Sequence, residues 1–185
     1  MEYLNKIMNK QDYLLGYKTE LFEIIIYSIV SFFLPLMIGH PQIVVGILIN
    51  ALLITSALNI KGYKLLPIII APTLGALSRG VLFGPFTIFL LYMIPFIWIG
   101  NSILIFAFKA LNLNKKVNYA ITLIIGSIIK ASFLFLVAYI LFSLNLVPLL
   151  FLTSMGIFQF YTAILGGILA FGVQYSKKRL TNNSV

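Results

Sequence analysis

The sequence predicts an all-α integral membrane protein with six transmembrane helices in one bundle and both termini in the cytoplasm. Hydrophobic residues make up 61% of the 185 residues, and charged residues only 9%. A soluble domain of this length cannot hide so much apolar surface, whereas lipid solvates it. Polar turns divide the chain into six apolar runs, and basic residues gather at alternate ends of these runs.

The six runs are close to the roughly 20 residues that a helix needs to cross a bilayer. We expect helices over 21–38, 42–60, 65–79, 86–109, 119–142 and 149–175. The third run is the shortest, and its Pro67 and Pro72 predict bending or partial unwinding. Residues 1–20 then form a cytoplasmic N-terminal segment, 21–175 the membrane domain, and 176–185 a basic cytoplasmic tail.

The distribution of basic residues predicts the orientation. With the N-terminus inside, eleven of the 13 lysines and arginines become cytoplasmic. Five or seven spans would place the basic C-terminal tail outside, so the span count and the orientation support each other. The exceptions are Arg79, at the outer end of the third run, and Lys130, in the middle of the fifth. The eleven are Lys6, Lys10, Lys18, Lys61, Lys64, Lys109, Lys115, Lys116, Lys177, Lys178 and Arg179.

The same distribution argues against several function classes. All four acidic residues lie at or before Glu23, which excludes paired-carboxylate catalysis and a carboxylate proton relay inside the membrane domain. With no cysteine and one histidine, His40, which we expect in a surface turn, we expect no metal and no other cofactor. No phosphate-binding glycine loop is present, and the lysines lie where membrane topology puts them. We therefore expect neither an enzyme nor a nucleic-acid-binding protein.

Lys130 is the strongest functional candidate. It lies about eleven residues into the fifth run, which at 1.5 Å per residue is near the middle of the bilayer. A lysine there costs at least about 2.5–3.5 kcal/mol unless it faces a polar cavity or a partner. The simplest functional interpretation is an anchor for an anionic group of a ligand. The alternatives are a snorkelling lysine and a lysine neutralised by burial and held by carbonyls.

Other polar residues share this depth or lie near it. Asn50 and Gln159 are at the level of Lys130 and are predicted to converge with it on one cavity, whereas Asn101 is expected to lie deeper and to be more structural. Each amide could instead join helices by hydrogen bonds. Arg79 is interpreted either as a second clamp on an anion or as an interfacial arginine. Trp98 is expected to stack on a ligand ring or simply to pack.

Small residues in the sixth run predict close helix packing, inside the bundle or toward a partner. They are Ala163, Gly166, Gly167 and Ala170.

Several stretches together resemble the substrate-binding S components of energy-coupling factor (ECF) vitamin transporters. They are Val45–Leu53, Pro72–Ala76, Ile94–Asn101, the helix 5 lysine Lys130 and Gln159–Gly167. The resemblance spans about residues 24–175 and implies a vitamin-sized ligand in an outward-facing pocket. It also implies a transmembrane coupling subunit with two ATPase subunits as partners. The stretch Tyr27–Phe33 lacks the Ala-x-x-x-Ala pattern that many S components carry there.

We therefore expect a non-enzymatic membrane subunit that takes up a small, anionic, vitamin-like molecule across the prokaryotic cell membrane. Two alternatives remain open. One is a stand-alone carrier or channel, whose uptake would persist without ATPase subunits. The other is a membrane assembly factor or enzyme acting on a lipid or an embedded protein, in which acid–base work would fall to Lys130 or a tyrosine.

Overall fold

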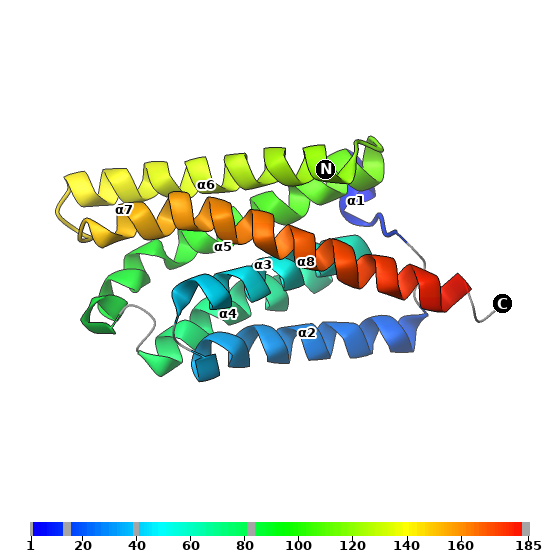
Figure 1. The fold of residues 1–185 in the computed structure, drawn as a ribbon, viewed down its shortest axis with the longest axis horizontal. Helices are drawn as coiled ribbons and strands as arrows, with labels where there is room; N and C mark the ends of the chain where they lie inside the picture. Colours follow the sequence, from blue (N-terminus) through cyan, green and yellow to red (C-terminus); the bar gives the residue numbers. More distant parts are fainter. Residues whose placement is uncertain (1, 13–15, 39–40, 81–83, 183–185) are drawn as a thin grey trace.

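The computed structural model describes residues 2–12, 16–38, 41–80 and 84–182, and these residues form helices and no strand. The long helices run back and forth between two ends of one bundle (Figure 1). The elements are α1 (Glu2–Met8), α2 (Tyr17–Ile38), α3 (Gln42–Asn59), η1 (Gly62–Leu65), α4 (Leu66–Arg79), η2 (Gly84–Phe89), α5 (Leu90–Ala107), η3 (Phe108–Asn114), α6 (Tyr119–Ser143), α7 (Leu150–Met155) and α8 (Ile157–Asn182).

Five segments of the described chain are long and apolar enough to cross a membrane. They are Tyr17–Ile38, Gln42–Asn59, Thr87–Asn114, Tyr119–Ser143 and Leu150–Arg179. The predicted third span is α4, which has 14 residues and lies beside α2 (Figure 1). Pro67 stands at the start of α4, where a missing backbone N–H breaks no helical bond. The described residues therefore form an all-helical bundle of five candidate spans, with the shorter α4 packed beside α2.

The helix α3 lies at the centre of the bundle and α2 at its edge. Over their most apolar windows, 56% of α3 is buried but only 11% of α2. Close backbone contacts hold both helices. A Cβ on Gly166 of α8 would lie 2.6 Å from the carbonyl oxygen of Ile47 in α3, and a Cβ on Gly75 of α4 would overlap the carbonyl of Phe32 in α2. Glycine at these positions allows the helices to touch.

The sixth apolar run, predicted as one helix over 149–175, is two helices. The chain breaks at Gly156, whose backbone angles are φ −96° and ψ −97°. The longer part, α8, continues to Asn182, into the range expected as a polar tail. At the other end of the chain, α2 begins at Tyr17, four residues before the predicted helix. Its first turn is held by the Glu20 carboxylate, which accepts hydrogen bonds from the backbone of Lys61 and the ammonium of Lys64.

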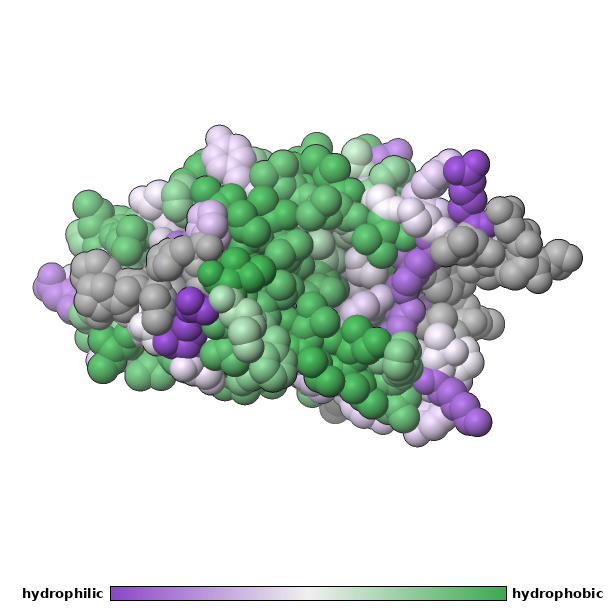
Figure 2. Space-filling view, turned by 60° about the horizontal axis from the view of Figure 1, so that its bottom comes forward, coloured by the Kyte–Doolittle hydropathy of each residue, from purple (hydrophilic) through white to green (hydrophobic). Residues whose placement is uncertain are grey.

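One end of the bundle is rich in charged side chains. The carboxylates of Glu20, Glu23 and Asp12 pair with Lys64, Lys177 and Lys178, at N–O distances of 2.6, 2.6 and 2.8 Å. The hydrogen bond that Lys64 donates to the Glu20 carboxylate raises the pKa of Lys64. Figure 2 shows one face of the molecule: hydrophobic residues cover its middle, and hydrophilic residues gather most densely toward the right-hand end.

Candidate functional site: a cavity beside Lys130

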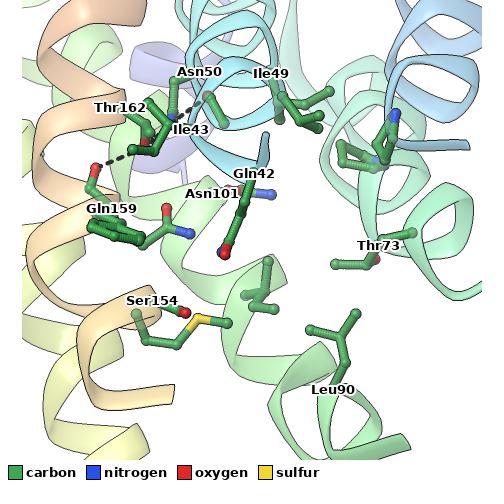
Figure 3. A pocket seen from close by; sticks show the side chains of 18 of the residues that line it. Gln42, Ile43, Ile49, Asn50, Thr73, Leu90, Asn101, Ser154, Gln159 and Thr162 are labelled. Atoms are coloured by element: carbon green, nitrogen blue, oxygen red, sulfur yellow. Dashed lines mark hydrogen bonds between the residues drawn. The ribbon is translucent and has the colours of Figure 1, made fainter. Parts of the chain in front are cut away.

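A cavity of about 90 Å³ lies inside the bundle, between the middle of the helices and the end opposite the charged residues. Figure 3 shows Asn101, Gln42, Gln159, Ser154 and Thr73 around this space. Its walls come from all the helices from α2 to α8. The lining residues are Pro35, Gln42, Ile43, Val45, Gly46, Ile49, Asn50, Pro72, Thr73, Ala76, Leu90, Ile97, Asn101, Lys130, Ser154, Met155, Phe158, Gln159 and Thr162.

Lys130 lies in the wall of this cavity, is only 2% exposed and projects from α6 toward α3 and α5. Its Nζ donates to the Oδ1 of Asn50 at 2.6 Å and to the Oδ1 of Asn101 at 3.0 Å. Both acceptors are neutral amides. The lysine is thus held by side-chain oxygens and not by backbone carbonyls, and no carboxylate lines the cavity among the described residues.

The two amides are themselves held in place. The Nδ2 of Asn50 donates to the carbonyl of Gly46 at 2.9 Å and to the Thr162 hydroxyl at 3.1 Å, and the Nδ2 of Asn101 donates to the carbonyl of Ile69 at 3.2 Å. Because these donors are engaged, the amide oxygens face Lys130. The network joins α3, α4, α5, α6 and α8 around one ammonium group.

Close packing of α5 against α6 explains how Lys130 reaches Asn101. A Cβ on Gly100 would lie 3.0 Å from the Leu134 side chain, and a Cβ on Gly126 would lie 3.1 Å from the Cβ of Ala107. These glycines therefore let the two helices approach on either side of Lys130. The long lysine stem spans the remaining gap to the polar heads.

Three acidic residues lie away from the cavity, at the charged end of the bundle. Asp12, Glu20 and Glu23 are all engaged there in ion pairs with lysines of η1 or α8. Among the described residues, the charge of Lys130 therefore has only dipoles around it. An anion in this cavity would complete an ion pair with Lys130.

Two predicted site residues lie outside the cavity wall. The guanidinium of Arg79 donates through Nη1 to the carbonyls of Leu36 and Met37, at 2.5 and 2.6 Å, and so caps the end of α2. Trp98 packs against the main core, and its Nε1 donates to the Thr73 hydroxyl at 2.7 Å. Thr73 lines the cavity, so Trp98 supports the wall from behind.

Of the remaining predicted residues, one lies in the cavity wall and the others pack between helices. Gln159 lines the cavity, next to Thr162, whose hydroxyl donates to the Gln159 backbone carbonyl at 3.3 Å. The small residues of α8 pack inside the bundle: Ala163 and Ala170 are fully buried, and a Cβ on Gly167 would overlap the Leu123 side chain of α6. His40 lies outside the described residues.

The structure adds polar residues that the sequence did not single out. Gln42, Thr73, Ser154 and Thr162 all line the cavity, and the Ser154 hydroxyl is buried without a hydrogen-bond partner among the described residues. Single hydroxyls in apolar helices carry almost no sequence signal, because they can bond to their own helix. Lys109, expected among the cytoplasmic lysines, is fully buried near the charged end, where its Nζ donates to the carbonyls of Ile60 and Lys10.

Comparison with known proteins adds no relative: the chain matches no protein-family model, no curated protein and no solved structure.

Proposed function

We propose that this protein is a membrane-embedded binding subunit that takes up a small anionic organic molecule, with Lys130 as its anchor. It crosses the membrane six times, with α4 as the short third span and both termini in the cytoplasm. The basic residues of the charged end support this orientation, because lysine and arginine are enriched in cytoplasmic loops.

The observation that carries the proposal is the incomplete coordination of a buried ammonium at a cavity wall. An ammonium group has three N–H donors, and Lys130 gives two of them to Asn50 and Asn101. A carboxylate or similar anion in the cavity would accept the third and supply the missing charge. The buried Ser154 hydroxyl, also in the wall, offers a second donor for the same ligand.

The size of the cavity restricts the ligand. Its volume of about 90 Å³ is several times the roughly 10–15 Å³ that one water occupies on the same measure. It therefore suits a small organic acid or the polar part of a vitamin-like molecule. The mixed lining of aliphatic and neutral polar side chains favours a ligand with one anionic group and an otherwise uncharged body.

Uptake needs a source of energy, and the chain contains no phosphate-binding glycine loop to hold ATP. We propose that a transmembrane coupling subunit with two ATPase subunits supplies it, as in ECF transporters. A stand-alone carrier would use the same Lys130 cavity. Measuring uptake in cells that lack the ATPase subunits distinguishes the ECF arrangement from the stand-alone carrier. Loss of uptake supports the ECF arrangement, and continued uptake supports the carrier.

The test of the binding site compares wild type with Lys130→Met. Native mass spectrometry of gently purified wild type should show a co-purified small anion, whose affinity is then measured. Lys130→Met keeps most of the apolar stem but removes the charge, so binding should weaken by about 2–5 kcal/mol. Arg79→Gln is the control and should keep the ligand, because Arg79 donates hydrogen bonds to α2 carbonyls and does not line the cavity.

Thermal unfolding of each variant separates binding from folding. A folded Lys130→Met variant that retains the ligand at full affinity would refute the proposed site. A variant that fails to fold with or without the ligand would show that Lys130 is a structural cation held by Asn50 and Asn101.

A further inference from the structure

A second cavity, of about 250 Å³, lies at the charged end of the bundle. It is separate from the Lys130 cavity, with which it shares no lining residue. Helix α8 supplies one wall, and the others come from the start of α6, from η3, from the end of α3 and from Asp12. The residues that matter here are Asp12, Tyr119, Phe171, Gln174, Tyr175 and Lys178.

The side-chain oxygen of Gln174, a residue in the cavity wall, lacks a hydrogen-bond donor within the described part of the chain. Its side chain is 5% exposed, and its Nε2 donates to the Oδ2 of Asp12 at 2.9 Å and to the Oδ1 of Asn59 at 3.1 Å. Its Oε1 is buried with no partner among the described residues. Rotating the amide by 180° would set its oxygen against two other oxygens, so the orientation is fixed. An N–H or O–H group from an occupant would satisfy Oε1.

The charges of the cavity indicate a zwitterionic occupant. Asp12 and Lys178 both line it and pair at 2.8 Å, so together they contribute no net charge. The Lys178 side chain is 55% exposed, which places its ammonium at the mouth. Within the described chain, the cavity wall thus holds an unpartnered acceptor on Gln174 and, on its exposed side, the Lys178 cation. A molecule with a donor at one end and an anion next to it matches both.

The place of the cavity in the fold indicates a lipid. Tyr119 is the first residue of α6, and Gln174 and Lys178 lie in the last turns of α8, so the cavity is at the level where two candidate spans end. Aromatic rings gather at this level in membrane proteins. Phe171 and Tyr175 are both exposed, and the exposed Ile168 continues the apolar surface toward the middle of α8.

We propose that this cavity binds the headgroup of a zwitterionic phospholipid with a primary amine, of the phosphatidylethanolamine type. Its ammonium donates to the Oε1 of Gln174, and the rings of Tyr119, Phe171 and Tyr175 surround that ammonium. Its phosphate contacts the Nζ of Lys178. One acyl chain lies along the exposed apolar face of α8. The site is distinct from the Lys130 cavity but depends on the membrane embedding proposed above.

The experiment compares phosphatidylethanolamine with phosphatidylcholine of the same acyl chains, presented as an equimolar mixture and read by native mass spectrometry of the retained lipid. The two lipids have the same charge and the same phosphate, but the trimethylated amine of phosphatidylcholine has no N–H. We expect roughly a tenfold preference for phosphatidylethanolamine, from one hydrogen bond involving a charged donor. Equal retention of the two lipids by wild type would overturn the proposal.

Two variants test which residues produce the preference for phosphatidylethanolamine. Gln174→Met should abolish the discrimination between the two lipids. Lys178→Met, at an exposed position, removes both the phosphate contact and the ion pair with Asp12. Both losses affect the two lipids alike, so retention of both should fall while their ratio stays unchanged. A Gln174→Met variant that still discriminates, or a Lys178→Met variant with full retention, would overturn the site. Because Gln174 also bridges Asp12 and Asn59, the wild-type lipid ratio decides if Gln174→Met does not fold.

Two controls follow. One tests whether this cavity acts independently of the Lys130 cavity, and the other distinguishes a lipid from a soluble ligand. Lys130→Met should keep the lipid preference, which shows that the two cavities act separately; its loss there would contradict the assignment. Soluble phosphoethanolamine carries the same headgroup chemistry without acyl chains. Displacement of the lipid by equimolar phosphoethanolamine would mean that a soluble zwitterion, and not a lipid, is the occupant.

Discussion

At the residue scale, Lys130 shows how a membrane protein can hold a buried cation without a carboxylate. Two amide oxygens, from Asn50 and Asn101, take the place of a counter-ion. Hydrogen bonds to dipoles compensate part of the desolvation cost but leave the charge formally unpaired. Such an ammonium retains its attraction for an anion, which a lysine already paired with aspartate would lose.

Asn50→Asp tests this idea directly. The new carboxylate would lie where the amide oxygen now lies, 2.6 Å from the Nζ of Lys130, and would form an internal ion pair. The Thr162 hydroxyl, which now accepts from Asn50, can rotate to donate to it, but the hydrogen bond to the Gly46 carbonyl is lost. We expect the variant to fold with reduced stability and to bind the proposed anionic ligand at least about tenfold more weakly, because the ligand must compete with the new carboxylate.

The measurement is ligand affinity beside thermal unfolding, with Asn50→Gln as the neutral control. Undiminished affinity in a well-folded Asn50→Asp variant would show that the ligand does not depend on the free charge of Lys130.

Part of this cavity wall could be predicted from depth alone. Asn50, Gln159 and Lys130 share a level in their helices, and all three line the cavity. Asn101 was expected to lie deeper and to be structural, yet its Oδ1 accepts from Lys130 at 3.0 Å. Residue counting gives the depth of a backbone atom, but a lysine side chain spans several ångströms and reaches other levels. Depth estimated by counting residues therefore indicates which backbone segments lie at the same level. It does not show how far a long side chain extends from that level.

Arg79 and Trp98 illustrate a different limit. Their depth in the sequence is clear, but the rotation of a helix about its axis decides which neighbour a side chain meets. Nearly uniform apolar helices carry little periodic signal for that rotation. Arg79 turns toward the end of α2, and Trp98 lies behind Thr73. Only the packed structure fixes these directions.

At the element scale, α3 and α8 form a close helix contact beside the site. Gly166 allows it, because an added Cβ would lie 2.6 Å from the Ile47 carbonyl oxygen and 2.8 Å from the Ala51 nitrogen. Both are backbone atoms, which cannot move aside as a flexible side chain can. The same contact aligns Asn50 on α3 with Thr162 on α8, at 3.1 Å. Gly166 therefore helps to position Asn50, one of the two amides that accept from Lys130.

We expect Gly166→Ala to destabilise the folded protein by about 1–3 kcal/mol through overpacking. Gly172 lies on the same helix, but an added Cβ there meets nothing within 4 Å. Gly172→Ala should therefore be neutral or stabilise by up to about 1 kcal/mol, from helix propensity alone. Thermal unfolding in the same detergent gives the comparison. Equal effects of the two substitutions would contradict the proposed close contact.

At the whole-molecule scale, α4 decides the topology. If the short α4 crosses the membrane, there are six spans and both termini lie on the same side. Hydropathy located all six apolar runs, and the structure contains a helix in each of them. The predicted third run, 65–79, agrees with α4 to within one residue, but hydropathy could not show that the sixth breaks at Gly156, because tertiary packing stabilises such interruptions.

Cysteine labelling in intact cells tests this arrangement. Lys115 and Ser143 stand near opposite ends of α6, and neither is fully buried. With the N-terminus inside, an impermeant thiol reagent should label Lys115→Cys only after the cells are opened and Ser143→Cys at once. The natural chain has no cysteine, so each signal comes from one position. Labelling of both positions from the same side would refute six spans in this orientation.

The two amides around Lys130 also bear on the order in which the protein is made. Asn50 and Asn101 belong to α3 and α5, both of which leave the ribosome before α6 does. In the proposed six-span topology, the insertion machinery therefore meets the costly lysine after the two helices that carry its acceptors. Moving the α6 segment ahead of α3 by circular permutation would remove that advantage, and the lysine-bearing helix would have to enter the lipid with no hydrogen-bond partner waiting for it.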